Sequence, residues 1–103
     1  MSKEIIVNFE VRSIEIMKNT LTQMGIKYSE DKSGNLKISK RWHNIVIDSK
    51  NGGLSYDEMD KIEVDKICLQ YQLNWFRDAA IREGNEIREE VMSNGEVCIH
   101  VLN

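Results

Sequence analysis

The sequence contains no proline and only two cysteines among its 103 residues. The absence of proline, with abundant Ile, Lys, Asn and Glu, is typical of coding from an AT-rich bacterium or its viruses. Two cysteines without a secretory signal favour a cytoplasmic protein whose thiols stay reduced. No apolar run approaches the roughly 20 residues of a membrane helix, so we expect no membrane segment.

Catalytic, metal and cofactor motifs are also missing. Cys68, Cys98, His43 and His100 are the candidate soft or imidazole ligands, but none has zinc-site spacing. Cys98 and His100 would share one strand face and could touch one ion, although small side chains at the edge of a core need no metal. The sequence has no phosphate-binding glycine motif and no nucleophile elbow. We therefore expect no metal, no cofactor and no enzyme, the alternative being a small enzyme that uses Cys98 with His43 or His100.

Polarity patterns in the first half of the chain predict a strand, a helix and then further strands. Residues 5–11 alternate in polarity, as in a strand with one buried face. Ser13 is a suitable N-cap for a helix that ends at Gly25, where a residue with positive φ belongs. Residues 26–29, 36–39, 44–48 and 54–56 have the character of short strands, and residues 40–43 either continue one of them or form a bulge.

The second half of the chain predicts a longer helix and a hairpin. Apolar residues at helical spacing define one face of this helix: Val64, Ile67, Cys68, Tyr71, Trp75 and Ala79, widened by Leu73, Phe76 and Ala80. Gly84 would end the helix, and an Asn-Gly pair would join strands at 86–92 and 97–102. The order predicts one α+β domain, residues 1–103, with an antiparallel sheet and two helices on one face in a ferredoxin-like arrangement, β-α-β-β-(β)-α-β-β.

Several short segments resemble an uncharacterised family that includes the hypothetical chloroplast and cyanobacterial reading frame thirty-five. The segments are Leu21-Thr22-Gln23-Met24-Gly25-Ile26, Asn44-Ile45-Val46-Ile47, Val64-Asp65-Lys66-Ile67 with the downstream Tyr71, and Gly84 followed by Glu86-Ile87. The resemblance spans most of the chain. It implies a shared α+β fold and carries over no catalytic residue.

The charges are distributed unevenly along the chain. Residues 27–50 hold six basic against three acidic side chains, whereas residues 57–96 hold five against eleven. Acids at the start of the second helix are partly explained by the helix dipole. A continuous acidic face would fit a basic groove on another protein. The candidate partner-binding acids are Asp57, Glu58, Asp60, Glu86, Glu89 and Glu90.

The basic segment supports an alternative function, the binding of nucleic acid or nucleotide. Its candidate residues are Lys37, Lys40, Arg41, Trp42 and His43. On a continuous strand, Lys37, Arg41 and His43 would share a face, and an exposed Trp42 could stack on a base. The opposing interpretation is a solvated strand face with Trp42 in the core.

These observations together predict a non-enzymatic interaction module that binds a protein partner with a basic surface. An inhibitor of a nucleic-acid-handling machine, encoded by a phage or a bacterium, is one form of such a module. A small adaptor subunit of a larger complex is another. A homodimer is compatible with either form, because an open sheet face or edge strand often pairs.

Overall fold

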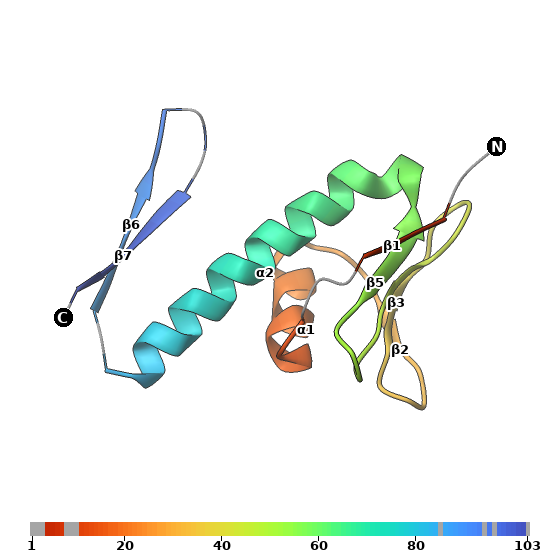
Figure 1. The fold of residues 1–103 in the computed structure, drawn as a ribbon, viewed down its shortest axis with the longest axis horizontal. Coiled ribbons are helices and arrows are strands. Elements are labelled where there is room, and N and C mark those ends of the chain that lie inside the picture. The colour runs from red at the N-terminus through yellow and green to blue at the C-terminus, as the bar shows by residue number, and fades with distance from the viewer. Residues whose placement is uncertain (1–3, 8–10, 85, 94, 96, 103) are drawn as a thin grey trace.

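The computed structural model describes residues 4–7, 11–84, 86–93, 95 and 97–102 (Figure 1). Of residues 7, 86, 87, 97, 99, 101 and 102, it describes the backbone alone. The elements are β1 (Glu4–Val7), α1 (Ile14–Gln23), β2 (Ser29–Glu30), β3 (Leu36–Ile38), β4 (Ile45–Ile47), β5 (Leu54–Asp57), the 3₁₀ turn η1 (Glu58–Asp60), α2 (Lys61–Arg82), β6 (Glu86–Val91) and β7 (Val97–Leu102).

Five of the strands form one antiparallel sheet in the order β1-β5-β4-β3-β2, and β6 and β7 form a separate antiparallel hairpin. The predicted α+β class, the antiparallel sheet and the final hairpin are confirmed. The ferredoxin-like arrangement is not. β2 to β5 follow one another as a meander, β1 joins its far edge beside β5, and the final hairpin lies outside this sheet.

The first helix begins and ends where the sequence indicates. Ser13 Oγ accepts a hydrogen bond from the Ile16 backbone N–H at 3.2 Å, which satisfies one of the free donors of the first turn. Gly25 has a φ of 72°, and the backbone N–H of Ile26 reaches back to the Leu21 carbonyl at 2.9 Å. This is the pattern in which a glycine with positive φ closes a helix.

The core lies between the helices and the inner face of the five-stranded sheet. Successive side chains of a strand point to opposite faces of the sheet, and six of them lie on the inner face: Leu36, Ile38, Ile45, Ile47, Leu54 and Tyr56. Met17 and Leu21 from α1 and Val64 and Ile67 from α2 pack against them. Each fully buried apolar side chain contributes about 1.5–3 kcal/mol relative to an exposed one, so this cluster supplies the main stabilisation of the fold.

Tyr71 connects α2 to the segment that precedes α1. Its side chain is buried, and its hydroxyl oxygen accepts hydrogen bonds from the backbone N–H groups of Arg12 at 2.8 Å and Ser13 at 3.1 Å. A buried hydroxyl that satisfies two backbone donors fixes the entry of the chain into α1 against α2.

The terminal hairpin (β6 and β7) packs against the C-terminal half of α2, away from the sheet (Figure 1). Arg77 of α2 reaches it, because the Arg77 Nε donates to Glu89 Oε1 at 2.6 Å. The molecule is elongated as a result, with extents of 48 × 34 × 23 Å. Its radius of gyration is 14.9 Å, whereas about 13 Å is typical of a compact domain of this length.

Candidate interaction surface

The candidate acidic residues occupy three different environments. Asp57 is fully buried, and its Oδ1 accepts from the Met59 N–H at 2.9 Å to cap η1. Its carboxylate therefore cannot meet a partner in this structure, which corrects its assignment to a binding surface. Glu58 is exposed and Asp60 is half-buried, both at the start of α2.

The remaining acids lie at the opposite end of α2, on the terminal hairpin. Glu89 faces α2 and pairs with Arg77, while Glu90 points to the other side of β6 and lies 3.2 Å from His100 Nε2. The side chain of Glu86 lies outside the described part of the structure. Glu89 lies beside Arg77, seventeen residues after Asp60 along the helix, a distance of about 25 Å at 1.5 Å per residue. The acids therefore do not form one continuous face.

The basic segment is a loop rather than a strand. β3 ends at Ile38 and β4 begins at Ile45, so Arg41 and His43 do not continue the face that holds Lys37, contrary to the prediction. The β3–β4 loop (residues 39–44) instead lies against the start of α2. Lys40 Nζ is 2.5 Å from Glu63 Oε2, which ties the loop to the first turn of the helix.

The tip of the β3–β4 loop exposes an aromatic ring. Trp42 keeps 57% of its surface accessible, so the interpretation that placed it in the core is wrong. The Arg41 guanidinium lies 5.2 Å from the centre of the indole ring, in cation–π range. Lys37 lies elsewhere, on β3, where it is 3.8 Å from Asp31. The loop therefore presents Arg41 and Trp42 as a small cationic and aromatic surface.

His43 lies beside the buried Asp57 carboxylate at the base of the loop. The His43 Nε2 is 3.9 Å from Asp57 Oδ2, which is too long for a hydrogen bond. This oxygen has no hydrogen-bond partner among the described residues. The contact between His43 and Asp57 places the end of the β3–β4 loop next to the start of η1.

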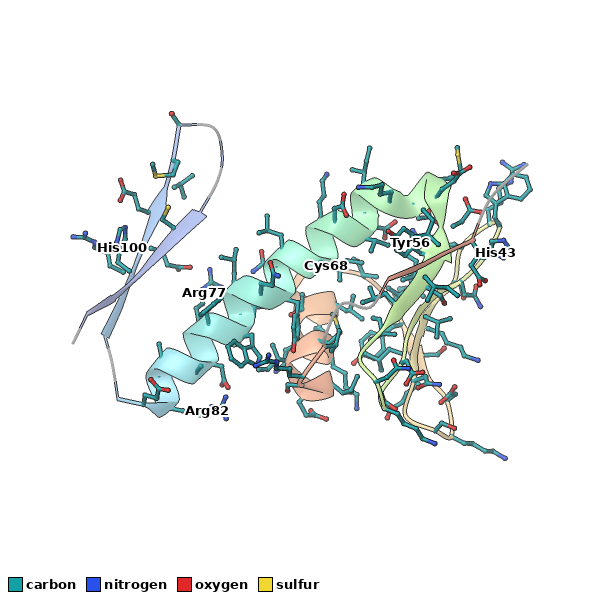
Figure 2. The ribbon with its side chains drawn as sticks, viewed as in Figure 1. His43, Tyr56, Cys68, Arg77, Arg82 and His100 are labelled. Carbon is teal, nitrogen blue, oxygen red and sulfur yellow. The ribbon has the colours of Figure 1, made fainter. Side chains whose placement is uncertain are left out.

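The structure separates His43 from Cys98 and His100, the other residues considered for catalysis. His43 lies in the β3–β4 loop, while Cys98 and His100 lie on β7 at the other end of the molecule (Figures 1 and 2). Cys68 is half-buried on α2, and desolvation raises the pKa of its thiol to about 11, with Asp65 adding to the shift. Such a thiol is a poor nucleophile. Within the described ranges, no group of three or more potential ligands could hold a metal ion.

An exposed apolar stripe runs along the face of α2 that points away from the core. Ile62, Leu69 and Phe76 keep 73%, 55% and 57% of their surface accessible, and Met59 in the preceding turn keeps 72%. We call these four residues the outer stripe. Seven residues make nearly two helical turns, so Ile62, Leu69 and Phe76 align along the helix. The buried Val64, Ile67 and Tyr71 lie about half a turn away.

Reasoning from the sequence missed this outer stripe. The helical pattern included Phe76 in the core stripe, whereas the structure leaves its side chain 57% exposed. The core face was predicted correctly for Val64, Ile67 and Tyr71. The seven-residue repeat of Ile62, Leu69 and Phe76 was the signal that could have revealed a second apolar face.

The terminal hairpin covers part of the same side of α2. Ala80, which follows the line of the outer stripe, is buried at the hairpin end of the helix. Val91, near the hairpin turn and on the same strand face as Glu89, keeps 73% of its surface accessible. The outer stripe and the hairpin thus form neighbouring surfaces with exposed apolar side chains.

No family model, curated protein or solved structure matches this chain. The family resemblance described from the sequence stays a prediction. Among the described residues, neither helix combines the length and the apolar character that a membrane span requires.

Proposed function

We propose that this protein is a small non-enzymatic interaction module that binds another protein chain through the outer face of α2. The observation that carries the proposal is the outer stripe. Soluble monomers rarely leave a row of large apolar side chains aligned on one helix, and such rows are typical of protein-binding sites. Exposed acids at both ends of α2, among them Glu58 and Glu90, favour a partner with basic groups beside its apolar contact.

Among the described residues, the half-buried Cys68 and the placement of the other candidate catalytic groups support a binding role over an enzymatic one. Desolvation raises the pKa of the Cys68 thiol to about 11, and His43 in the β3–β4 loop lies far from Cys98 and His100 on β7. Acid–base or nucleophilic catalysis requires such groups within hydrogen-bond reach of one another. An inhibitor and an adaptor subunit are both forms of the proposed module.

The proposal is tested by capture of partners on tagged protein from a nuclease-treated lysate of a low-GC bacterium. Wild type is compared with Leu69→Lys, which places a charge in the middle of the outer stripe. Thr22→Lys, an exposed position on α1, is the matched control. A protein, including a second copy of this chain, that binds wild type and the control but not Leu69→Lys supports the proposal. Unchanged binding by Leu69→Lys would overturn it, and so would a wild type that captures no protein and is itself monomeric.

The exposed Trp42 favours a second candidate function, the binding of single-stranded nucleic acid by the β3–β4 loop. An indole with an adjacent guanidinium can stack on a base for about 1–3 kcal/mol. Lys40 is already paired with Glu63, so Arg41 and Trp42 would carry most of the binding. Fluorescence titration of Trp42 with a short oligonucleotide at low salt tests this candidate, with Trp42→Ala as the variant. No titration signal from wild type would exclude it.

A further inference from the structure

We propose that the outer stripe is occupied by a second copy of this chain, paired by a two-fold axis that places the two α2 helices antiparallel. This inference rests on the proposed function, because it names the partner that covers the same surface. Three observations carry it: the excess of exposed surface, the symmetric spacing of the outer stripe, and opposite charges at the two ends of one side of α2.

The chain exposes more surface than a monomer of its size requires. Its accessible surface is 7170 Å², whereas a folded monomer of 12.0 kDa has about 6,000 Å². The excess of about 1,200 Å² compares with the roughly 800 Å² that each partner buries in a stable interface. The excess is therefore of the size that one partner buries in a dimer interface.

The outer stripe is complementary to itself. Leu69 lies seven residues from both Ile62 and Phe76. When two α2 helices run antiparallel across a two-fold axis at Leu69, this residue meets its own copy. Ile62 of each chain then lies opposite Phe76 of the other. A two-fold interface requires this kind of reciprocal match, and the seven-residue repeat is the spacing of helices packed along a seam.

The β3–β4 loop and the terminal hairpin attach to the same side of α2. Lys40 binds Glu63 near the start of the helix, and Glu89 binds Arg77 near its end. Glu63 and Arg77 are fourteen residues apart, which is close to four full turns, so they project from one side. In the antiparallel pair this side is shared, and the hairpin of each chain lies next to the β3–β4 loop of the other.

The surfaces that meet in this way carry opposite charges. Lys40 and Glu89 are already paired within the chain, with Glu63 and Arg77. The exposed charges that meet are therefore Arg41 of the β3–β4 loop and Glu90 of β6. A two-fold axis generates this contact twice, once at each end of the interface. Opposite charges at the two ends of the interface therefore favour the antiparallel orientation of one chain on the other.

Sedimentation equilibrium of the full chain over a range of protein concentrations tests the dimer. We expect a reversible monomer–dimer equilibrium that Leu69→Lys shifts toward monomer by at least about tenfold, since two like charges then meet on the axis. Circular dichroism of Leu69→Lys verifies that it is folded. A wild type that stays monomeric, or a dimer insensitive to Leu69→Lys, would overturn the proposal.

Charge exchange tests the orientation independently of the outer stripe. Arg41→Glu and Glu90→Lys should each weaken the homodimer, because like charges then face each other at both ends. A mixture of the two variants should form a heterodimer in which both contacts are again complementary. Lys50→Glu and Glu15→Lys, exposed positions away from α2, are the matched controls and should dimerise like wild type. Failure of the two variants to associate on mixing would overturn the antiparallel arrangement.

The same measurements separate this inference from the proposed function. A wild type that is monomeric in sedimentation, yet captures a different protein in a manner that depends on Leu69, overturns the homodimer and leaves the interaction module standing. A dimer that depends on both Leu69 and the exchanged charges supports both.

Discussion

On its inner face α2 buries Val64, Ile67 and Tyr71, whereas on its outer face the same helix leaves Ile62, Leu69 and Phe76 more than half exposed. The two faces have similar residue types, so composition does not distinguish them. What differs is the neighbour. α1 and the sheet cover the inner face, while the terminal hairpin covers only the end of the outer one. Apolar residues at helical spacing therefore indicate a helix face that is to be buried. They do not indicate whether the same chain or another chain buries it.

Truncation of the inner face should give the largest effect. Ile67 is fully buried between the sheet and α1. Ile67→Ala should lower the free energy of unfolding by about 3 kcal/mol, because it removes buried methyl groups and leaves a cavity. Urea denaturation followed by circular dichroism measures the change. A loss below about 1 kcal/mol would mean that the inner face is not the core.

Removal of the Tyr71 hydroxyl should have the next largest effect. Tyr71→Phe retains the ring but leaves the backbone N–H groups of Arg12 and Ser13 without this acceptor. We expect a loss of about 1–3 kcal/mol in the free energy of unfolding. Tyr28→Phe, at a half-buried position between α1 and β2, is the control. Equal losses for both variants would argue against a special role for the Tyr71 hydroxyl.

Arg77→Ala should affect the hairpin rather than the core. Arg77 joins Asn74 of α2 to Glu89 of β6, and exposed ion pairs contribute about 0.2–1 kcal/mol. Amide hydrogen exchange should become faster in β6 and β7 and stay unchanged in β4. Arg82→Ala, which removes a surface pair with Asp78 within α2, serves as the control and should leave the hairpin amides unchanged. Faster exchange in β4 with Arg77→Ala would contradict this separation.

Truncation of the outer face should change stability least. Leu69→Ala removes a side chain that is already exposed, so the free energy of unfolding at low protein concentration should stay within about 0.5 kcal/mol of wild type. Urea denaturation at low and high protein concentration distinguishes two outcomes. A loss that grows with concentration would indicate the dimer, because a dimer interface contributes to stability by mass action. A large loss at low concentration would mean that the outer face belongs to the core of the monomer.

Thiol labelling provides a test of burial on α2 that needs no change in stability. Desolvation raises the pKa of Cys68 to about 11, so its thiolate is scarce at pH 8 and becomes more abundant as the pH rises. With Cys98→Ser, the rate of labelling at Cys68 should be about a hundredfold below that of an unfolded thiol. Labelling in denaturant supplies the reference rate. A native rate equal to the denatured one would contradict the burial of Cys68.

Several features of the fold were predictable because they depend on neighbours in the sequence. The cap at Ser13, the stop at Gly25 and the core face of α2 follow from local hydrogen bonding, backbone conformation and helical spacing. The candidate site was less predictable. Aspartate is a residue type that usually lies on the surface, but the position of Asp57 at the junction of β5 and η1 buries its side chain as a cap. Trp42 has a large apolar side chain of the kind often found in a core, but the β3–β4 loop exposes it to solvent.

The sequence by itself determined the α+β class, the helix boundaries and the alternation of the strands, since each follows from contacts between residues a few positions apart. The tertiary structure decided the strand order, the placement of the hairpin on α2 and the separation of the acids to opposite ends of that helix. These features depend on contacts between distant segments, whose free energy local patterns do not specify. The outer stripe could be recognised only from the tertiary structure, which shows which face of α2 packs against the sheet and α1.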